Sequence, residues 1–175
     1  ELKENEFKDL YDDGEEQTEK EYVKEIQIDT DFELLFPDEY VNNITERLNL
    51  YNDLAAVKNE EELIAFEAKL IDRFGPLPKQ AQALLISMRI KWLATKMGLE
   101  KLVLKQGKMV GYFVGDQQSD YYQSGVFHKV LQFVQRHQNL GRMKEKQTKN
   151  GLRLLLTFEN VKSLKKALEL LEMVF

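Results

Sequence analysis

Residues 71–78, Ile71-Asp72-Arg73-Phe74-Gly75-Pro76-Leu77-Pro78, decide how the first half of this chain folds. Upstream of them, apolar residues recur at helical spacing and form one stripe: Leu63, Phe66, Leu70, Ile71 and Phe74. Gly75 supplies the permissive backbone that the end of a helix needs, and Pro76 cannot continue the helix. Pro78 fits the first turn of a new helix, because its missing N–H would be unpaired there in any case. The stretch therefore predicts the end of one helix, a corner and the start of the next.

Two charged residues of this stretch, Asp72 and Arg73, are not explained by the corner. Counted from Leu63 at about 100° per residue, Asp72 falls about 180° away and faces solvent or a partner. An acidic side chain in the last turn of a helix also meets the negative end of the helix dipole, which costs about 0.3–1 kcal/mol when exposed. Two interpretations stay open: an ion pair inside the domain, for example with Arg47, or a contact with a partner.

Composition limits the chemistry of the chain before any motif is considered. Its 175 residues are 43% apolar and include no cysteine, so a core can form while disulfides, zinc–thiolate sites and cysteine nucleophiles are excluded. No apolar run approaches the roughly 20 residues of a membrane-spanning helix, and the first residues do not form a signal peptide. We therefore expect a soluble, cytoplasmic chain with no membrane association. Because it starts at Glu1 in the middle of a pattern, we expect a fragment of a longer protein.

The negative charge is concentrated at the N-terminal end. Residues 1–40 hold 16 acidic and 4 basic side chains, whereas residues 41–175 hold 14 acidic and 21 basic ones. The segment Asp12-Asp13-Gly14-Glu15-Glu16 is too polar to pack, so residues 1–21 are predicted to be the end of a preceding module and an acidic flexible linker. Residues 22–175 are predicted to form one domain, with a helical part over about 38–98 and a sheet part over about 99–175.

The helical part is predicted to contain a hairpin and one long helix. Ile44, Leu48, Tyr51 and Ala55 share one face of the first helix of the hairpin, and Asn59 is the N-cap of the second. The long helix, from Pro78 to about Met97, carries apolar stripes on two nearly opposite sides. One stripe consists of Ala81, Leu84, Leu85, Met88 and Trp92, and the other of Ile86, Ile90, Leu93 and Met97. Such a helix should be buried between two layers.

Residues 99–175 follow a ββα plan twice. Gln106-Gly107 separates the strands of the first predicted hairpin and Asn150-Gly151 those of the second, and a helix with an apolar stripe follows each hairpin. Residues 22–28 alternate and also predict a strand. Leu152, Leu154, Leu156 and Phe158 are expected to alternate inward. The fold class is therefore α+β: an N-terminal helical hairpin and a long central helix, followed by a four-stranded, mostly antiparallel sheet covered on one face by helices.

The sequence contains no motif for catalysis, nucleotide binding or metal binding. Gly107-Lys108 lacks both the upstream glycine and the following Ser or Thr of a phosphate-binding loop. His128 and His137 lie nine residues apart on one predicted helix and point to opposite sides, so they cannot share a metal ion. No nucleophile elbow is present. We therefore predict no catalytic residue, no metal and no cofactor in this chain.

Basic residues gather between Arg142 and Lys166, where eight of them stand against two acidic residues. They are Arg142, Lys144, Lys146, Lys149, Arg153, Lys162, Lys165 and Lys166. A basic hairpin beside a basic helix could grip phosphates, and the first five of these residues are the candidate nucleic-acid contacts. Lysines on an edge strand also prevent aggregation, and surface lysines are common. A solvated surface is therefore the default interpretation and a nucleic-acid-binding module is the alternative.

Four segments of the sequence, taken in order, resemble a known family. They are Pro37-Asp38-Glu39-Tyr40, Arg47-Leu48 with Tyr51, the run from Leu70 to Pro78, and Lys96-Met97-Gly98-Leu99. Their order and spacing over about residues 24–100 resemble the C-terminal domain of the bacterial transcription-repair coupling factors, the Mfd family. Beyond Gly98 only the ββα plan is similar, and residues 1–20 resemble the tail of the preceding translocase module with its linker.

The resemblance implies a regulatory part of a larger machine. Full-length members of the family are ATP-driven translocases on double-stranded DNA that displace stalled RNA polymerase and recruit the excision-repair protein UvrA. ATP and magnesium belong to their motor domains, which lie upstream of this part. The C-terminal domain has no catalysis of its own and acts as an autoinhibitory clamp, because it packs on the N-terminal UvrB-like module and covers the surface that UvrA would use.

The resemblance also assigns roles to residues at the corner. Asp72 and Arg73 would belong to the contact between domains, together with Lys69, where members of the family often have Glu. The residues that match the structural motif of the family are Phe74, Gly75, Pro76 and Pro78, with Arg47 and Tyr51.

Overall fold

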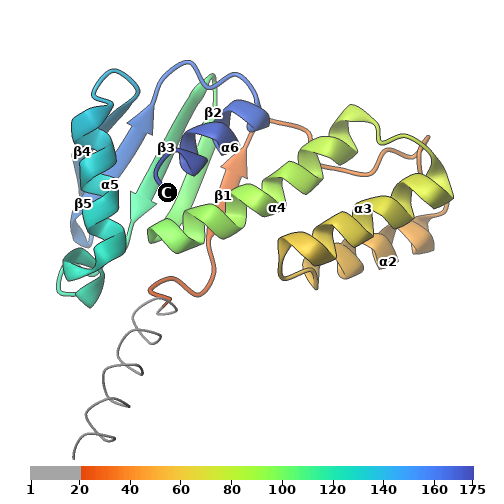
Figure 1. The fold of residues 1–175 in the computed structure, drawn as a ribbon, viewed down its shortest axis with the longest axis horizontal. Helices are drawn as coiled ribbons and strands as arrows, with labels where there is room; N and C mark the ends of the chain where they lie inside the picture. Colours follow the sequence, from red (N-terminus) through yellow and green to blue (C-terminus); the bar gives the residue numbers. More distant parts are fainter. Residues whose placement is uncertain (1–20) are drawn as a thin grey trace, which may run out of the picture.

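The computed structural model describes residues 21–175 as a five-stranded sheet and a helical hairpin that one long helix joins (Figure 1). The predictions made for residues 1–20 lie outside the described residues. The elements are, in order, β1 (Gln27–Thr30), α2 (Ile44–Ala55), α3 (Glu60–Phe74), α4 (Lys79–Met97), β2 (Leu99–Lys105), β3 (Lys108–Phe113), the 3-10 helix η1 (Asp120–Gln123), α5 (Gly125–Arg136), β4 (Gly141–Thr148), β5 (Gly151–Phe158) and α6 (Leu164–Glu172). The α+β class is confirmed.

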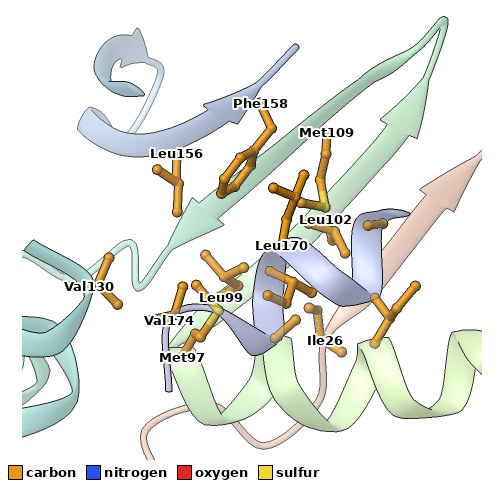
Figure 2. Packing of buried hydrophobic residues seen from close by; sticks show 14 of the residues in the cluster. Ile26, Met97, Leu99, Leu102, Met109, Val130, Leu156, Phe158, Leu170 and Val174 are labelled. Atoms are coloured by element: carbon orange, nitrogen blue, oxygen red, sulfur yellow. The ribbon is translucent and has the colours of Figure 1, made fainter. Parts of the chain in front are cut away.

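Helix α4 carries two apolar stripes that face two separate cores, as predicted. Ala81 and Leu85 are buried in the core of the hairpin, against residues of α2 and α3. Ile90 and Met97 are buried in the other core, between the sheet and helices α5 and α6 (Figure 2). Because one rigid helix contributes to both cores, it fixes the hairpin relative to the sheet.

The sheet has five strands in the order β1-β2-β3-β5-β4, so the prediction of four strands is wrong. The additional strand, β1, pairs in parallel with β2 in the register Gln27↔Lys101. A parallel pair needs a long crossover, and here the chain passes through all of α2, α3 and α4 before it returns. Local sequence patterns do not indicate pairing between residues that lie so far apart in the chain. The alternation at residues 22–28 also placed the predicted strand too early. Val23 and Ile26 precede β1 and are buried in the core instead.

Both predicted hairpins form, with one shift in the second turn. Gln106 and Gly107 have φ values of 54° and 72°, which match a two-residue turn that needs positive φ at both positions. In the second hairpin Thr148 pairs with Gly151, so Lys149 and Asn150 form the turn. Gly151, with φ 110°, takes the positive φ at the first position of β5.

Helices α4, α5 and α6 cover one face of the sheet (Figure 1). Leu156 and Phe158 of β5 point into this side and are buried, as predicted. Leu152 is 46% exposed, so its predicted inward position is wrong. It lies beside the turn at the tip of the β4–β5 hairpin, where the helical cover ends. No helix of residues 21–175 packs on the opposite face of the sheet.

Candidate functional site

The corner at residues 71–78 forms as the sequence predicts, and the structure adds the backbone conformation of Gly75 and the position of Pro78 relative to α4. Helix α3 ends at Phe74, and Gly75 has φ 89° and ψ −169°, a backbone region that is essentially restricted to glycine. The Gly75 N–H donates to the carbonyl of Ile71 at 2.9 Å. Pro78, with φ −68°, is the N-cap of α4 and not a residue of its first turn. The corner is thus fixed by backbone conformation and does not need the two charged side chains.

Tyr40 holds this corner from the side, a role that the sequence did not reveal. Its hydroxyl lies 2.8 Å from the carbonyl oxygen of Gly75 and 3.2 Å from that of Leu70, and its ring centroid lies 5.7 Å from that of Phe74. Burial raises the pKa of the Tyr40 hydroxyl, which keeps it protonated as a donor. The only signal in the sequence was its place in the segment 37–40, outside any periodic stripe.

Arg47 and Tyr51 connect α2 to the segment before it. Arg47 forms an ion pair with Asp38 at 3.0 Å and donates to the carbonyl of Val41 at 2.9 Å. The Tyr51 hydroxyl accepts a hydrogen bond from the Phe36 N–H at 2.8 Å. The structure therefore gives Arg47 a partner other than Asp72.

The three residues assigned to an interdomain contact are all exposed at the end of α3. Arg73 forms an ion pair with Glu46 of α2, and its guanidinium lies 5.1 Å from the centroid of the Phe74 ring. The side chains of Asp72 and Lys69 form no ion pair or hydrogen bond within residues 21–175. The two charged residues of the corner therefore differ: Arg73 has a partner inside the domain, whereas Asp72 has none within residues 21–175.

The apolar residues that share one face of α2 are not equally buried. Ile44 and Leu48 are 67% and 58% exposed, whereas Tyr51 packs against the hairpin core. The side that faces the core contains Arg47, Leu50 and Leu54, at helical spacing. Since Arg47 reaches Asp38 and the Val41 carbonyl from this side, a charged residue concealed the inward stripe from a reading of hydrophobic periodicity.

Exposed apolar side chains therefore lie at the same end of the hairpin as the Asp72 carboxylate, which has no partner within residues 21–175. The Arg73–Glu46 ion pair brings the last turn of α3 beside the first turn of α2 (Figure 1). Ile71 of α3 is 44% exposed at this end. We call Ile44, Leu48, Ile71, Asp72 and Arg73 the hairpin end. An exposed apolar side chain next to charged ones, here Ile71 next to Asp72 and Arg73, is compatible with an interaction surface.

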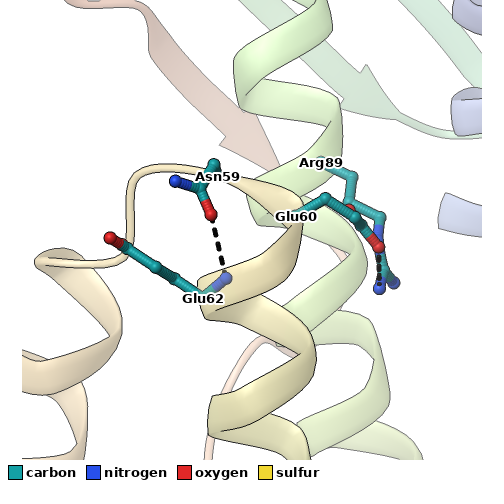
Figure 3. A network of polar contacts seen from close by, with 4 residues as sticks. All are labelled: Asn59, Glu60, Glu62 and Arg89. Carbon is teal, nitrogen blue, oxygen red and sulfur yellow. Dashed lines mark hydrogen bonds and ion pairs between the residues drawn. The ribbon is translucent and has the colours of Figure 1, made fainter.

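A second polar contact fixes the other end of α3 against α4. Arg89 donates from Nε to both carboxylate oxygens of Glu60 at 2.9 Å and from Nη2 at 2.7 Å (Figure 3). This hydrogen bonding lowers the pKa of Glu60. Asn59 caps the helix as predicted, because its side-chain oxygen accepts from the Glu62 N–H at 2.9 Å. The orientation of the hairpin end is thus set from both ends of α3.

The basic residues predicted between 142 and 166 are divided between two sides of the sheet. Arg142, Lys144 and Lys146 lie on β4 and Arg153 on β5, while Lys149 lies in the turn between them. Lys165 and Lys166 lie on α6, which covers the opposite face, and Lys162 lies two residues before that helix. One continuous basic surface over 142–166 is therefore not formed.

Metal-binding clusters and membrane-spanning helices are both absent from residues 21–175. Residues 21–175 contain no group of three or more His, Cys, Asp or Glu side chains that could hold a metal ion. None of their helices combines the length and apolar character that crossing a membrane requires.

The chain is similar to known coupling factors. The family model described as the TRCF domain matches residues 30–124. The chain is 41% identical over 68 residues to the transcription-repair-coupling factor of Escherichia coli (strain K12), covering 39% of this chain and 6% of that protein. It is 32% identical over 111 residues to the transcription-repair-coupling factor of Rickettsia prowazekii (strain Madrid E), covering 63% of this chain and 9% of that protein. The chain thus spans less than a tenth of the length of these two relatives.

The fold has a counterpart among solved structures. A crystal structure of the C-terminal domain of a transcription-repair coupling factor superimposes with a TM-score of 0.64 at 16% identity and covers 86% of this chain and 91% of its own. At this identity the likeness concerns the fold alone. The family follows from the sequence match, which extends over more than half of the 175 residues. The chain belongs to the TRCF domain family, the domain of the transcription-repair coupling factors.

Proposed function

We propose that this chain is a non-catalytic regulatory domain of a transcription-repair coupling factor and acts as an autoinhibitory clamp. It binds the N-terminal UvrB-like module of the same protein and covers the surface that recruits UvrA. The full-length parent is an ATP-hydrolysing translocase in the cytoplasm that acts on double-stranded DNA and displaces stalled RNA polymerase. ATP and magnesium are bound by its motor domains, outside this chain.

One observation carries the proposal: the exposed Asp72 carboxylate has no partner within residues 21–175 and directly follows the exposed apolar residue Ile71. The helix dipole does not favour an acidic residue in the last turn of α3. The expected internal partner, Arg47, is bound to Asp38 instead. A cationic group on the UvrB-like module would give Asp72 the partner that its own domain does not provide.

The energy that such a clamp requires is modest. To keep the UvrA surface covered in 99% of molecules, the closed state must lie about 2.7 kcal/mol below the open one, twice the 1.36 kcal/mol of a tenfold ratio. Complete burial of an exposed Leu or Ile side chain is worth about 1.5–3 kcal/mol. Partial burial of Ile44 and Leu48, together with one ion pair to Asp72, therefore suffices.

The test is a charge reversal at the hairpin end of the full-length protein. We expect Asp72→Lys combined with Arg73→Glu to raise the apparent affinity for UvrA by up to about 100-fold, because the masked state is lost. The same double change in the 175-residue chain should cost less than about 1 kcal/mol, since the Arg73–Glu46 pair is exposed. Asp53→Lys, an exposed change near the opposite end of α2, is the matched control and should leave UvrA binding unchanged.

The opposite pattern would decide for a structural role. If UvrA affinity stays the same while the free energy of unfolding of the 175-residue chain falls by several kcal/mol, Asp72 and Arg73 serve the internal structure and the clamp is wrong.

A further inference from the structure

The helix-free face of the sheet carries a basic surface that the proposed clamp does not use. Side chains alternate along each strand, and the register aligns Lys144 with Leu155 and Lys146 with Arg153, on the side opposite the buried Leu156 and Phe158. Lys101 joins this face through its pairing with Tyr112, which is itself aligned with Leu155. We call Lys101, Arg142, Lys144, Lys146 and Arg153 the basic face.

The three basic residues of β4 have no ion-pair partner among residues 21–175. The side chains of Arg142, Lys144 and Lys146 are exposed and form no ion pair among the described residues. Residues two apart on a strand lie about 7 Å from each other, so these residues form a row of about 14 Å along the edge of the sheet. The acidic residue between them, Glu145, alternates to the other face.

Towards the middle of the sheet, the basic face is ordered around one aromatic ring. The Lys101 ammonium and the Arg153 guanidinium lie 5.6 Å and 5.5 Å from the centroid of the Tyr112 ring. Arg153 also donates to the carbonyl of Phe113 and lies 3.6 Å from Glu100. These contacts hold the Lys101 and Arg153 side chains in place over the central strands. Neighbouring strands lie about 5 Å apart, so Arg153 on β5 is one strand away from the row on β4 and Lys101 on β2 is three strands away.

We propose that the basic face binds the phosphate backbone of a nucleic acid. A continuous polyanion can meet cations that are spread over several strands, and each phosphate contact needs only a positive side chain. An acidic peptide that paired with the free edge of β4 would engage the row on that strand and leave Lys101 and Arg153 unused. The distribution over β2, β5 and β4 therefore favours a nucleic acid over an acidic peptide, independently of whether the clamp exists.

This surface differs from the one that the sequence suggested. It excludes the basic residues at α6, which lie on the covered side of the sheet, and it adds Lys101 from a distant part of the chain. The two sets therefore supply a matched pair of variants. One removes three charges from the basic face: Arg142→Gln, Lys144→Gln and Lys146→Gln. The other removes three charges at α6: Lys162→Gln, Lys165→Gln and Lys166→Gln.

Fluorescence anisotropy of the 175-residue chain with labelled duplex and single-stranded DNA, over a series of salt concentrations, tests the proposal. We expect salt-dependent binding of at least one probe. The basic-face variant should lose at least about tenfold in affinity, and its salt slope on duplex DNA should fall by about 2.7, which is 0.9 for each lost phosphate contact. The α6 variant should stay within about twofold of the unchanged chain. Far-UV circular dichroism and the urea midpoint should match for all three proteins.

Three outcomes would overturn the proposal. The first is no salt-dependent binding of either DNA, and the second is an equal loss in both triple variants, which would indicate non-specific charge attraction. The third is binding of a labelled polyglutamate as tight as that of DNA with the same dependence on Arg142, Lys144 and Lys146, which would assign the surface to an acidic protein.

Discussion

Replacement of Gly98 by Ala should be among the most damaging single-methyl changes in this chain. Gly98 ends α4 with φ 89° and ψ 25°, and an added Cβ would lie 2.2 Å from Cε2 and 2.3 Å from Cζ of Tyr121. The Tyr121 ring cannot easily give way, because it is fully buried and its hydroxyl donates to the carbonyl of Met97. Left-handed backbone costs about 1–2 kcal/mol and overpacking about 1–3 kcal/mol. We therefore expect a loss of about 2–5 kcal/mol.

Gly107 provides the control for this prediction. It also has a positive φ, 72°, but a Cβ there would meet no atom within 4 Å. Gly107→Ala should therefore cost only the backbone part, about 1–2 kcal/mol. Urea unfolding followed by far-UV circular dichroism gives both free energies of unfolding. Equal losses for the two variants, within about 0.5 kcal/mol, would refute the argument that Tyr121 blocks a side chain at residue 98.

Two further predictions concern the contacts that hold the hairpin. Tyr40→Phe removes the hydroxyl that faces the carbonyls of the corner and should lower the free energy of unfolding by about 1 kcal/mol in urea; an unchanged value would show that this hydrogen bond is not stabilising. The pKa of Glu60 is lowered by its hydrogen bond from Arg89, so its contribution is present above the ordinary value of 4.5 and is lost as the pH falls through the lower folded-state value. Because the pair is partly exposed, Glu60→Gln should remove only about 0.5 kcal/mol at neutral pH and flatten the acid limb of the stability curve; an acid limb identical to that of the unchanged chain would contradict this.

The sequence correctly predicted those elements that are determined by residues close together in the chain. The two stripes of α4 were recognised because both are apolar at helical spacing, and their separation over two cores followed directly. The corner at Gly75 was recognised because glycine and proline restrict the backbone whatever surrounds them. The buried side of α2 was not recognised because Arg47 lies on it, and hydrophobic periodicity does not reveal a charged residue that turns inward to bond a carbonyl and a carboxylate.

Pairings between distant segments account for what the sequence did not disclose. The parallel pairing of β1 with β2 joins residues 27 and 101, and the contact of Arg89 with Glu60 joins two helices across the hairpin core. The division of the basic residues depends on which side of the sheet each strand position faces, and that is fixed only when the register is known. The separate roles of Asp72 and Arg73 likewise became visible only when Glu46 was found beside Arg73.

The most direct test of the proposed clamp is a calorimetric titration of this chain against the N-terminal UvrB-like module of the same protein, followed by competition with UvrA. The account predicts a saturable one-to-one complex that UvrA displaces, that Asp72→Lys weakens by at least about tenfold, and that Asp53→Lys leaves unchanged. Absence of binding, or a complex that still accepts UvrA with full affinity, would contradict it.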